Sequence, residues 1–134
     1  MRKLLPAIAG AVMMLGMTAA AHATEWIECA DPAGEAQIGL LAGGLDFAQF
    51  SRAHLLVGSE SWSTDPTLEP GTPLAIGDSF MSGTEFYATL TDADRNDVLA
   101  ELRVFVVSNE SGDAKGGVLT VPGKGVWAVS CEGP

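Results

Sequence analysis

Short runs of alternating, β-branched or aromatic residues recur along this chain from residue 25 onward, and glycine, proline or aspartate closes most of them. The clearest run is 98–108, where Val98, Ala100, Leu102, Val104 and Val106 are expected on one face and Glu101 and Arg103 on the other. Because successive side chains of a strand point to opposite faces, this pattern predicts a central strand with one apolar face. About seven to nine such runs predict an all-β domain, either a small antiparallel β-sandwich or a barrel.

The predicted strands are joined by segments rich in turn residues. Gly58-Ser59 is typical of a tight hairpin, 65–72 contains two prolines and reads as a loop, and 109–117 reads as a polar connection. The predicted strands are 25–29, 35–41, 50–57, 60–64, 73–76, 84–91, 98–108, 118–121 and 126–131.

One segment has an alternative interpretation as a helix. Thr91 followed by Asp94 approximates a capping box, which would start a helix running through Leu102. The β-branched and aromatic residues at 104–107 favour a strand instead. We therefore predict a strand for residues 98–102 and keep a partly helical 91–102 as the alternative.

Residues 1–23 have the features of a cleavable signal peptide. Arg2 and Lys3 precede an uncharged apolar run, 4–20, which ends in the small-residue triplet Ala21-His22-Ala23. The alternative is a membrane anchor, but the run is short and contains proline and glycine. We expect a single β domain at 24–134 that is periplasmic or secreted and makes no stable membrane insertion after cleavage.

Cys29 lies in the first predicted strand and Cys131 in the last. After export neither thiol would be kept reduced, so we predict a disulfide between them. A reactive thiol or metal pair is the alternative, but there is no Cys-x-x-Cys spacing and no nearby histidine. The bridge requires the first and last strands to be neighbours, which suits a closed barrel or sandwich better than an open meander.

The charge of the chain is strongly negative, with 17 acidic and 7 basic residues and a net charge of -10. Loss of Arg2 and Lys3 with the leader would bring it to -12. Nucleic-acid binding depends on cationic side chains against phosphates, so we expect no nucleic-acid partner. An anionic surface speeds encounter with cationic proteins, which makes such a protein the expected partner.

Residue patterns for catalysis are missing from the sequence. His54 is the only histidine after residue 23, and no glycine-flanked nucleophile elbow is present. As an outward strand residue beside Arg52, His54 is expected to be a solvated surface group. One imidazole with no free thiol does not make a zinc site. We therefore expect neither an enzyme nor a cofactor.

The turn at 92–97 is the strongest local signal for a ligand. Asp92, Asp94, Asn96 and Asp97 place oxygen ligands at spacings that calcium loops use. The full pattern fails, because Asp97 occupies the glycine position and Arg103 the position of the bidentate glutamate. We expect a solvated hairpin tip and keep these four residues as weak calcium candidates.

Three tryptophans complete the list of candidate residues. Trp26 and Trp127 share strands with the two cysteines and are expected to be core aromatics near the bridge. Trp62 stands among polar residues beside the loop 65–72. Core packing is the favoured role for Trp62, and a binding anchor is the alternative.

In size, leader, strand content and charge the chain resembles the small periplasmic lysozyme inhibitors of Gram-negative bacteria. No recognition-loop motif of those proteins is present, so no residue roles are carried over. The resemblance implies a binding or inhibitory module directed at a cationic protein such as a lysozyme, with loops 59–72 or 109–117 entering a cleft. The alternative is an envelope structural, ligand-binding or calcium-binding module with no enzyme target; the oligomeric state is left open.

Overall fold

Nine β-strands form a closed barrel in the computed structural model, which describes residues 24–43 and 50–133. The expected all-β fold is confirmed, and of the two expected forms it is the barrel. The predicted leader, 1–23, lies outside the described residues. The strands are β1 (Glu25–Ala30), β2 (Ala36–Ala42), β3 (Phe50–Val57), β4 (Glu60–Ser63), β5 (Thr72–Met81), β6 (Glu85–Asp92), β7 (Val98–Asn109), β8 (Gly112–Val121) and β9 (Gly125–Glu132).

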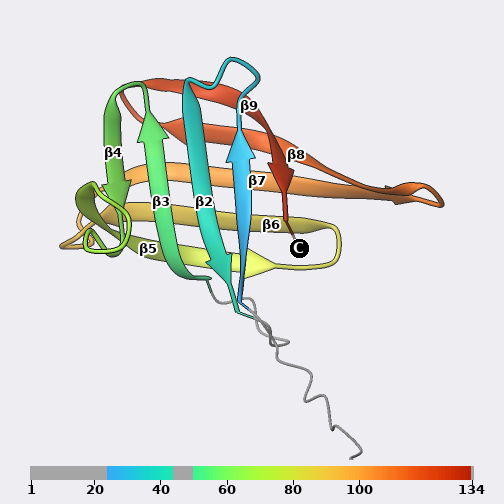
Figure 1. Ribbon diagram of the computed structural model, residues 1–134, viewed down its shortest axis with the longest axis horizontal. Coiled ribbons are helices and arrows are strands. Elements are labelled where there is room, and N and C mark those ends of the chain that lie inside the picture. Colours follow the sequence, from blue (N-terminus) through green and yellow to red (C-terminus); the bar gives the residue numbers. More distant parts are fainter. Residues whose placement is uncertain (1–23, 44–49, 134) are drawn as a thin grey trace, which may run out of the picture.

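The barrel is an antiparallel meander with one exception. Strand β4 is parallel to β5, and their ladder contains only the pairs Trp62–Thr72 and Ser63–Pro73. Strand β9 returns to β1 and closes the barrel. In Figure 1 strands β1 to β4 run roughly upright, whereas β5 to β8 cross them almost at right angles. The short β4 is thus the link between two differently oriented groups of strands.

The barrel interior is filled by one face of each strand. In β7 the residues Ala100, Leu102 and Val104 are buried and Glu101 and Arg103 are exposed, as the alternation predicts. Val98, expected on the same apolar face, is exposed because the register shifts at this end of the strand, and Val106 is only partly buried because it lies beyond the end of the β6–β7 ladder. Interior-facing positions of a small barrel are filled by such side chains. The largest fully buried hydrophobic side chains are Ile27, Ile38, Leu40, Leu55, Leu90, Leu102, Leu119 and Val104.

The predicted disulfide is present. Cys29 and Cys131 are directly opposite each other in the β1–β9 ladder, and their sulfur atoms are bonded. The bridge therefore connects strands that are neighbours in space and 102 residues apart in the chain. It closes the barrel covalently where the two ends of the fold meet.

The predicted end of β5 was wrong, whereas the strand predicted for residues 98–102 is confirmed. The strand predicted at 73–76 continues to Met81. A β-bulge between Ile76 and Ser79 interrupts the alternation of side chains, so the sequence pattern ends there although the strand does not. At the bulge the Asp78 backbone N–H donates to Thr89 Oγ1 at 2.8 Å. The helix alternative is wrong because residues 98–102 pair with β6 on one side.

Within the described ranges no helix is long and apolar enough to cross a membrane.

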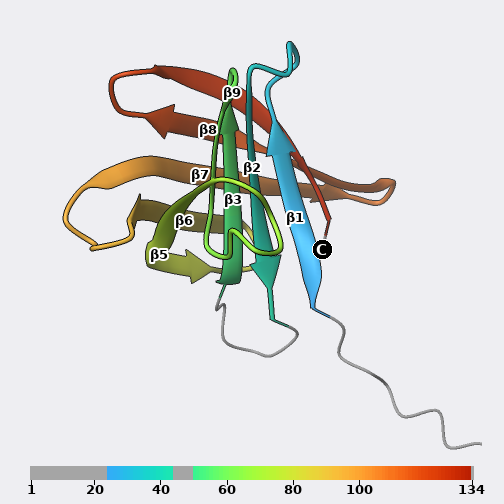
Figure 2. The ribbon, with the colours of Figure 1, turned by 60° about the vertical axis from the view of Figure 1, so that its left-hand side comes forward.

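The polar connection predicted at 109–117 is instead part of a hairpin. Strands β7 and β8 stay paired as far as Asn109–Gly112, and only Glu110 and Ser111 form the turn. Pairing of β6 with β7 ends at Phe105, and pairing of β9 with β8 begins at Gly116. The tip therefore projects from the barrel as a two-stranded ribbon (Figures 1 and 2). Both of its faces meet solvent, and residues 109–117 lack the alternation of apolar and polar residues that would predict a strand.

Candidate functional site

A cluster of polar and aromatic side chains lies on the outer face of β1, β2 and β3, around His54. The His54 ring lies over Gly39 of β2, where a Cβ would stand 2.1 Å from Nε2. His54 Nε2 is 2.9 Å from Glu28 Oε1, and its ring centroid is 5.1 Å from that of Trp26. Only 16% of the His54 side chain is exposed. It points outward as expected, but the expectation of a solvated group was wrong because its neighbours cover it.

Arg52 extends this cluster toward the loop that follows β4. Its guanidinium carbon lies 5.4 Å from the Trp26 ring, and its Nη2 pairs with Glu69 Oε1. The hydrogen bond from Arg52 lowers the pKa of Glu69, and the same bond raises the pKa of Arg52. Trp26 therefore packs on the outside of the barrel, and its prediction as a core aromatic was wrong. Trp127 does pack against the core, as expected.

The loop 64–71 is fastened over this face at several points. Ser63 Oγ donates to the Glu69 carbonyl oxygen at 2.5 Å, and the Thr67 backbone N–H donates to Asp65 Oδ1 at 3.1 Å. A hydrogen bond from the Thr67 hydroxyl lowers the pKa of Asp65. An open pocket of about 240 Å³ remains between this loop and the strands, lined by His54, Leu55, Leu56, Ser61, Trp62, Leu68, Glu69 and Pro70.

Trp62 occupies the end of β4 at this pocket. It packs against the buried core, as favoured from the sequence, and Lys124 Nζ lies 5.7 Å from its ring. Lys124 also pairs with Glu60. The Trp62 indole therefore contacts the buried core and also lies near the surface ion pair of Lys124 and Glu60.

The geometry around His54 favours a structural role. A catalytic histidine must hydrogen-bond the hydroxyl or thiol that it activates. In residues 24–43 and 50–133 the hydrogen bond recorded for the His54 ring is the one to Glu28, with no such hydroxyl or thiol. The cluster instead holds the loop 64–71 against the barrel through Arg52 and Glu69.

The ion pair between Arg52 and Glu69, which we call the clamp, should break as the pH falls. Because the pKa of Glu69 in the folded protein lies below its ordinary value of 4.5, the clamp contributes stability above that value and loses it as pH falls through the lowered pKa. We expect the Trp26 indole N–H resonance to move as pH falls below 4.5, the ordinary pKa of glutamate, through the lowered pKa of Glu69. Glu69→Gln should abolish the movement and Glu85→Gln, the control, should preserve it. An unchanged titration in Glu69→Gln would contradict this assignment.

The turn predicted as a weak calcium site joins β6 to β7. Asp92 Oδ1 accepts the backbone N–H groups of Asn96 at 2.7 Å and Asp97 at 3.4 Å. One carboxylate is thus already engaged in holding the turn. Across the described part of the chain, no three acidic, histidine or cysteine side chains gather to hold a metal ion. Calcium binding by Asp92, Asp94, Asn96 and Asp97 stays a hypothesis.

An exposed apolar surface follows the outer side of β7, β8 and β9, and we call it the hairpin face. It consists of Phe105, Val107, Val118 and Val126, of which Val107 is 69% and Phe105 50% exposed. In the ladders Phe105 faces Gly116 and Val107 faces Ala114, so small residues flank the large ones. The acidic residues on the same side or at the tip are Glu85, Glu101, Glu110 and Glu132, and Arg103, which pairs with Glu85, lies on the same side.

The basic residues of the domain are engaged within the protein. Arg52, Arg103 and Lys124 pair with Glu69, Glu85 and Glu60. Arg95 and Lys115 donate to the backbone carbonyls of Ile76 and Gly133. The excess of carboxylates is therefore left without internal cationic partners, which concentrates negative potential at the surface.

A scan against models of known families and searches of curated proteins and of solved structures find no match to this chain.

Proposed function

We propose that this protein is a binding module that docks on a cationic protein through the hairpin face, and that it performs no chemistry itself. Exposed apolar patches rimmed by polar residues mark interaction surfaces in soluble proteins. The observation that supports the proposal is the apolar surface of Phe105, Val107, Val118 and Val126, which continues onto a projecting hairpin and has acidic residues around it.

The two parts of this surface have different roles. Apolar side chains at the centre of an interface supply most of the affinity, whereas charges at its rim accelerate encounter and select the partner. The projecting ribbon also makes the surface convex. A convex ribbon fits a cleft, so an enzyme such as a lysozyme, which is cationic and has a substrate cleft, would be inhibited when the ribbon enters it.

The proposal is tested by calorimetric titration against a panel of cationic lysozymes and proteases, with inhibition measured in parallel. We expect Val107→Ser to weaken binding about tenfold or more, since interface anchors typically contribute more than 1 kcal/mol. Val98→Ser is the matched control, because Val98 is also exposed but lies at the opposite end of β7. Binding should weaken as salt rises, through a slower association rate.

Two results would contradict the proposal. The first is an absence of binding across the panel at low salt. The second is equal weakening by Val107→Ser and Val98→Ser, which would place the contact away from the hairpin face. Thermal melts of both variants show whether each is folded, and exposed substitutions of this kind normally change stability by less than about 0.5 kcal/mol.

A further inference from the structure

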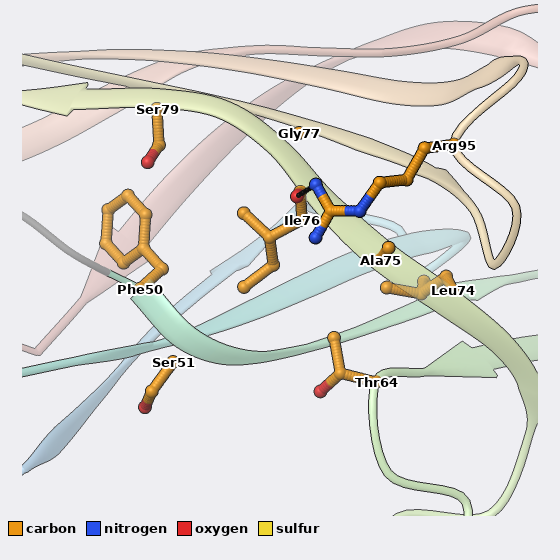
Figure 3. A pocket seen from close by; sticks show the side chains of 9 residues that line it. All are labelled: Phe50, Ser51, Thr64, Leu74, Ala75, Ile76, Gly77, Ser79 and Arg95. Atoms are coloured by element: carbon orange, nitrogen blue, oxygen red, sulfur yellow. Dashed lines mark hydrogen bonds between the residues drawn. The ribbon is translucent and has the colours of Figure 1, made fainter.

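A second pocket lies where β3 and β5 diverge below the short β4. Strand β4 pairs with both β3 and β5, but it ends at Ser63. In the described part of the chain, no ladder therefore joins the first residues of β3 to β5. The pocket has a volume of about 410 Å³ and opens to solvent. Figure 3 shows Phe50 and Ile76 pointing into the space between the two strands, with the Arg95 guanidinium reaching in from the β6–β7 turn.

The lining of this pocket combines an apolar floor with hydroxyl groups and one charge. Phe50 and Leu74 are buried and Ile76 is partly buried. The hydroxyls come from Ser51, Thr64 and Ser79; that of Ser51 donates to the Leu41 carbonyl oxygen at 3.5 Å and that of Thr64 to the Ala53 carbonyl oxygen at 3.3 Å. Among the described lining residues, Arg95 is the charged side chain.

Arg95 is an exposed residue whose backbone has a conformation that is uncommon for arginine. Its φ is +61°, and within the described residues it is the one non-glycine residue with positive φ. Glycine, asparagine and aspartate adopt this conformation more readily than arginine does. Backbone strain of this kind is concentrated at ligand sites, where it places a side chain for function.

The guanidinium of Arg95 retains free hydrogen-bonding capacity. Nη1 donates to the Ile76 carbonyl oxygen at 3.1 Å, which fixes the side chain across β5. A guanidinium carries five N–H donors in a planar fork that matches a carboxylate. In the same turn, Asp92 Oδ1 accepts the backbone N–H groups of Asn96 and Asp97.

We propose that this pocket binds a small amphipathic carboxylate. The carboxylate pairs with the Arg95 fork, and a short apolar body lies on Phe50, Leu74 and Ile76. This is a small-molecule site, separate from the hairpin face and independent of the proposed protein partner.

The test is an NMR titration of the whole domain with butyrate, hexanoate and octanoate. We expect saturable shifts of the Arg95 Nε–H and of the Ile76 and Gly77 amides, with a Kd near or below about 1 mM for the best ligand. Hexanamide, which is neutral, and inorganic phosphate, which has no apolar body, should each bind at least tenfold more weakly.

Variants separate the ligand role of Arg95 from a structural one. Arg95→Gly and Arg95→Gln should each weaken hexanoate binding at least tenfold, and Arg103→Gln, the control, should leave it unchanged. Arg95→Gly should melt at the same or a higher temperature, because glycine adopts the positive φ without strain.

Three results would overturn the proposal: retention of binding by both Arg95 variants, equal binding of hexanamide or phosphate, and shifts that do not saturate or that map elsewhere. If Arg95→Gly does not fold, Arg95→Gln decides the first of these.

Discussion

The double variant Cys29→Ala/Cys131→Ala is expected to lose about 4 to 5 kcal/mol of folding stability. The disulfide closes a loop of 102 residues, and in the chain-entropy model a loop of about this length removes roughly 4.7 kcal/mol of denatured-state entropy. Its two ends face each other across β1 and β9, so the bridge forms within an existing ladder. For a domain of this size the loss corresponds to a fall in melting temperature of roughly 20 °C.

Urea unfolding of the oxidised protein, of the reduced protein and of the double variant measures this effect. Reduction and double substitution should give similar midpoints, since both free the same loop. The circular dichroism of β-strands should persist below the lowered midpoint. A loss of less than about 1 kcal/mol in this urea experiment would contradict the chain-entropy argument and would show that the denatured chain is already restricted without the bridge.

The variant Gly117→Ala is expected to cost about 2 to 3 kcal/mol, a value typical of an overpacked site. A Cβ at Gly117 would lie 1.8 Å from the Arg103 carbonyl oxygen, which belongs to the backbone of the paired strand β7. Because backbone cannot rotate away as a side chain can, β7 and β8 would have to separate locally.

Gly116→Ala is the matched control for this variant. A Cβ at Gly116 would approach the Val129 carbonyl oxygen no closer than 3.3 Å, so a shift of a few tenths of an ångström accommodates it. We expect Gly116→Ala to lose less than about 1 kcal/mol in the same urea experiment. Equal losses in the two variants would mean that glycine is needed in β8 for a reason other than the contact with Arg103.

Strands with one buried face were predictable from the sequence. In β3, Ala53 and Leu55 point inward and Arg52 and His54 outward, as the alternation indicates. The disulfide was predictable because both cysteines lie in strands at the ends of the domain. The hairpin tip was not predictable, since its strand conformation comes from cross-strand pairing in solvent and leaves no apolar face.

The geometry of the candidate sites depends on register, which the sequence does not reveal. His54 is covered because β3 pairs with β2 so that Gly39 lies opposite it. A glycine within the predicted strand 35–41 was the available signal, because such a glycine often marks close approach of another group. The position of Arg95 over β5 had no comparable signal. It follows from a turn conformation that arginine rarely adopts.

The pairing of the first strand with the last has a consequence for how the molecule forms. Strand β1 is synthesised first, yet one of its edges finds a partner only when β9 has been made. Such distant pairings raise contact order and slow folding. Until β9 is made, the nascent polypeptide exposes an open sheet edge to other chains, so a chaperone that shields this edge would protect it from aggregation.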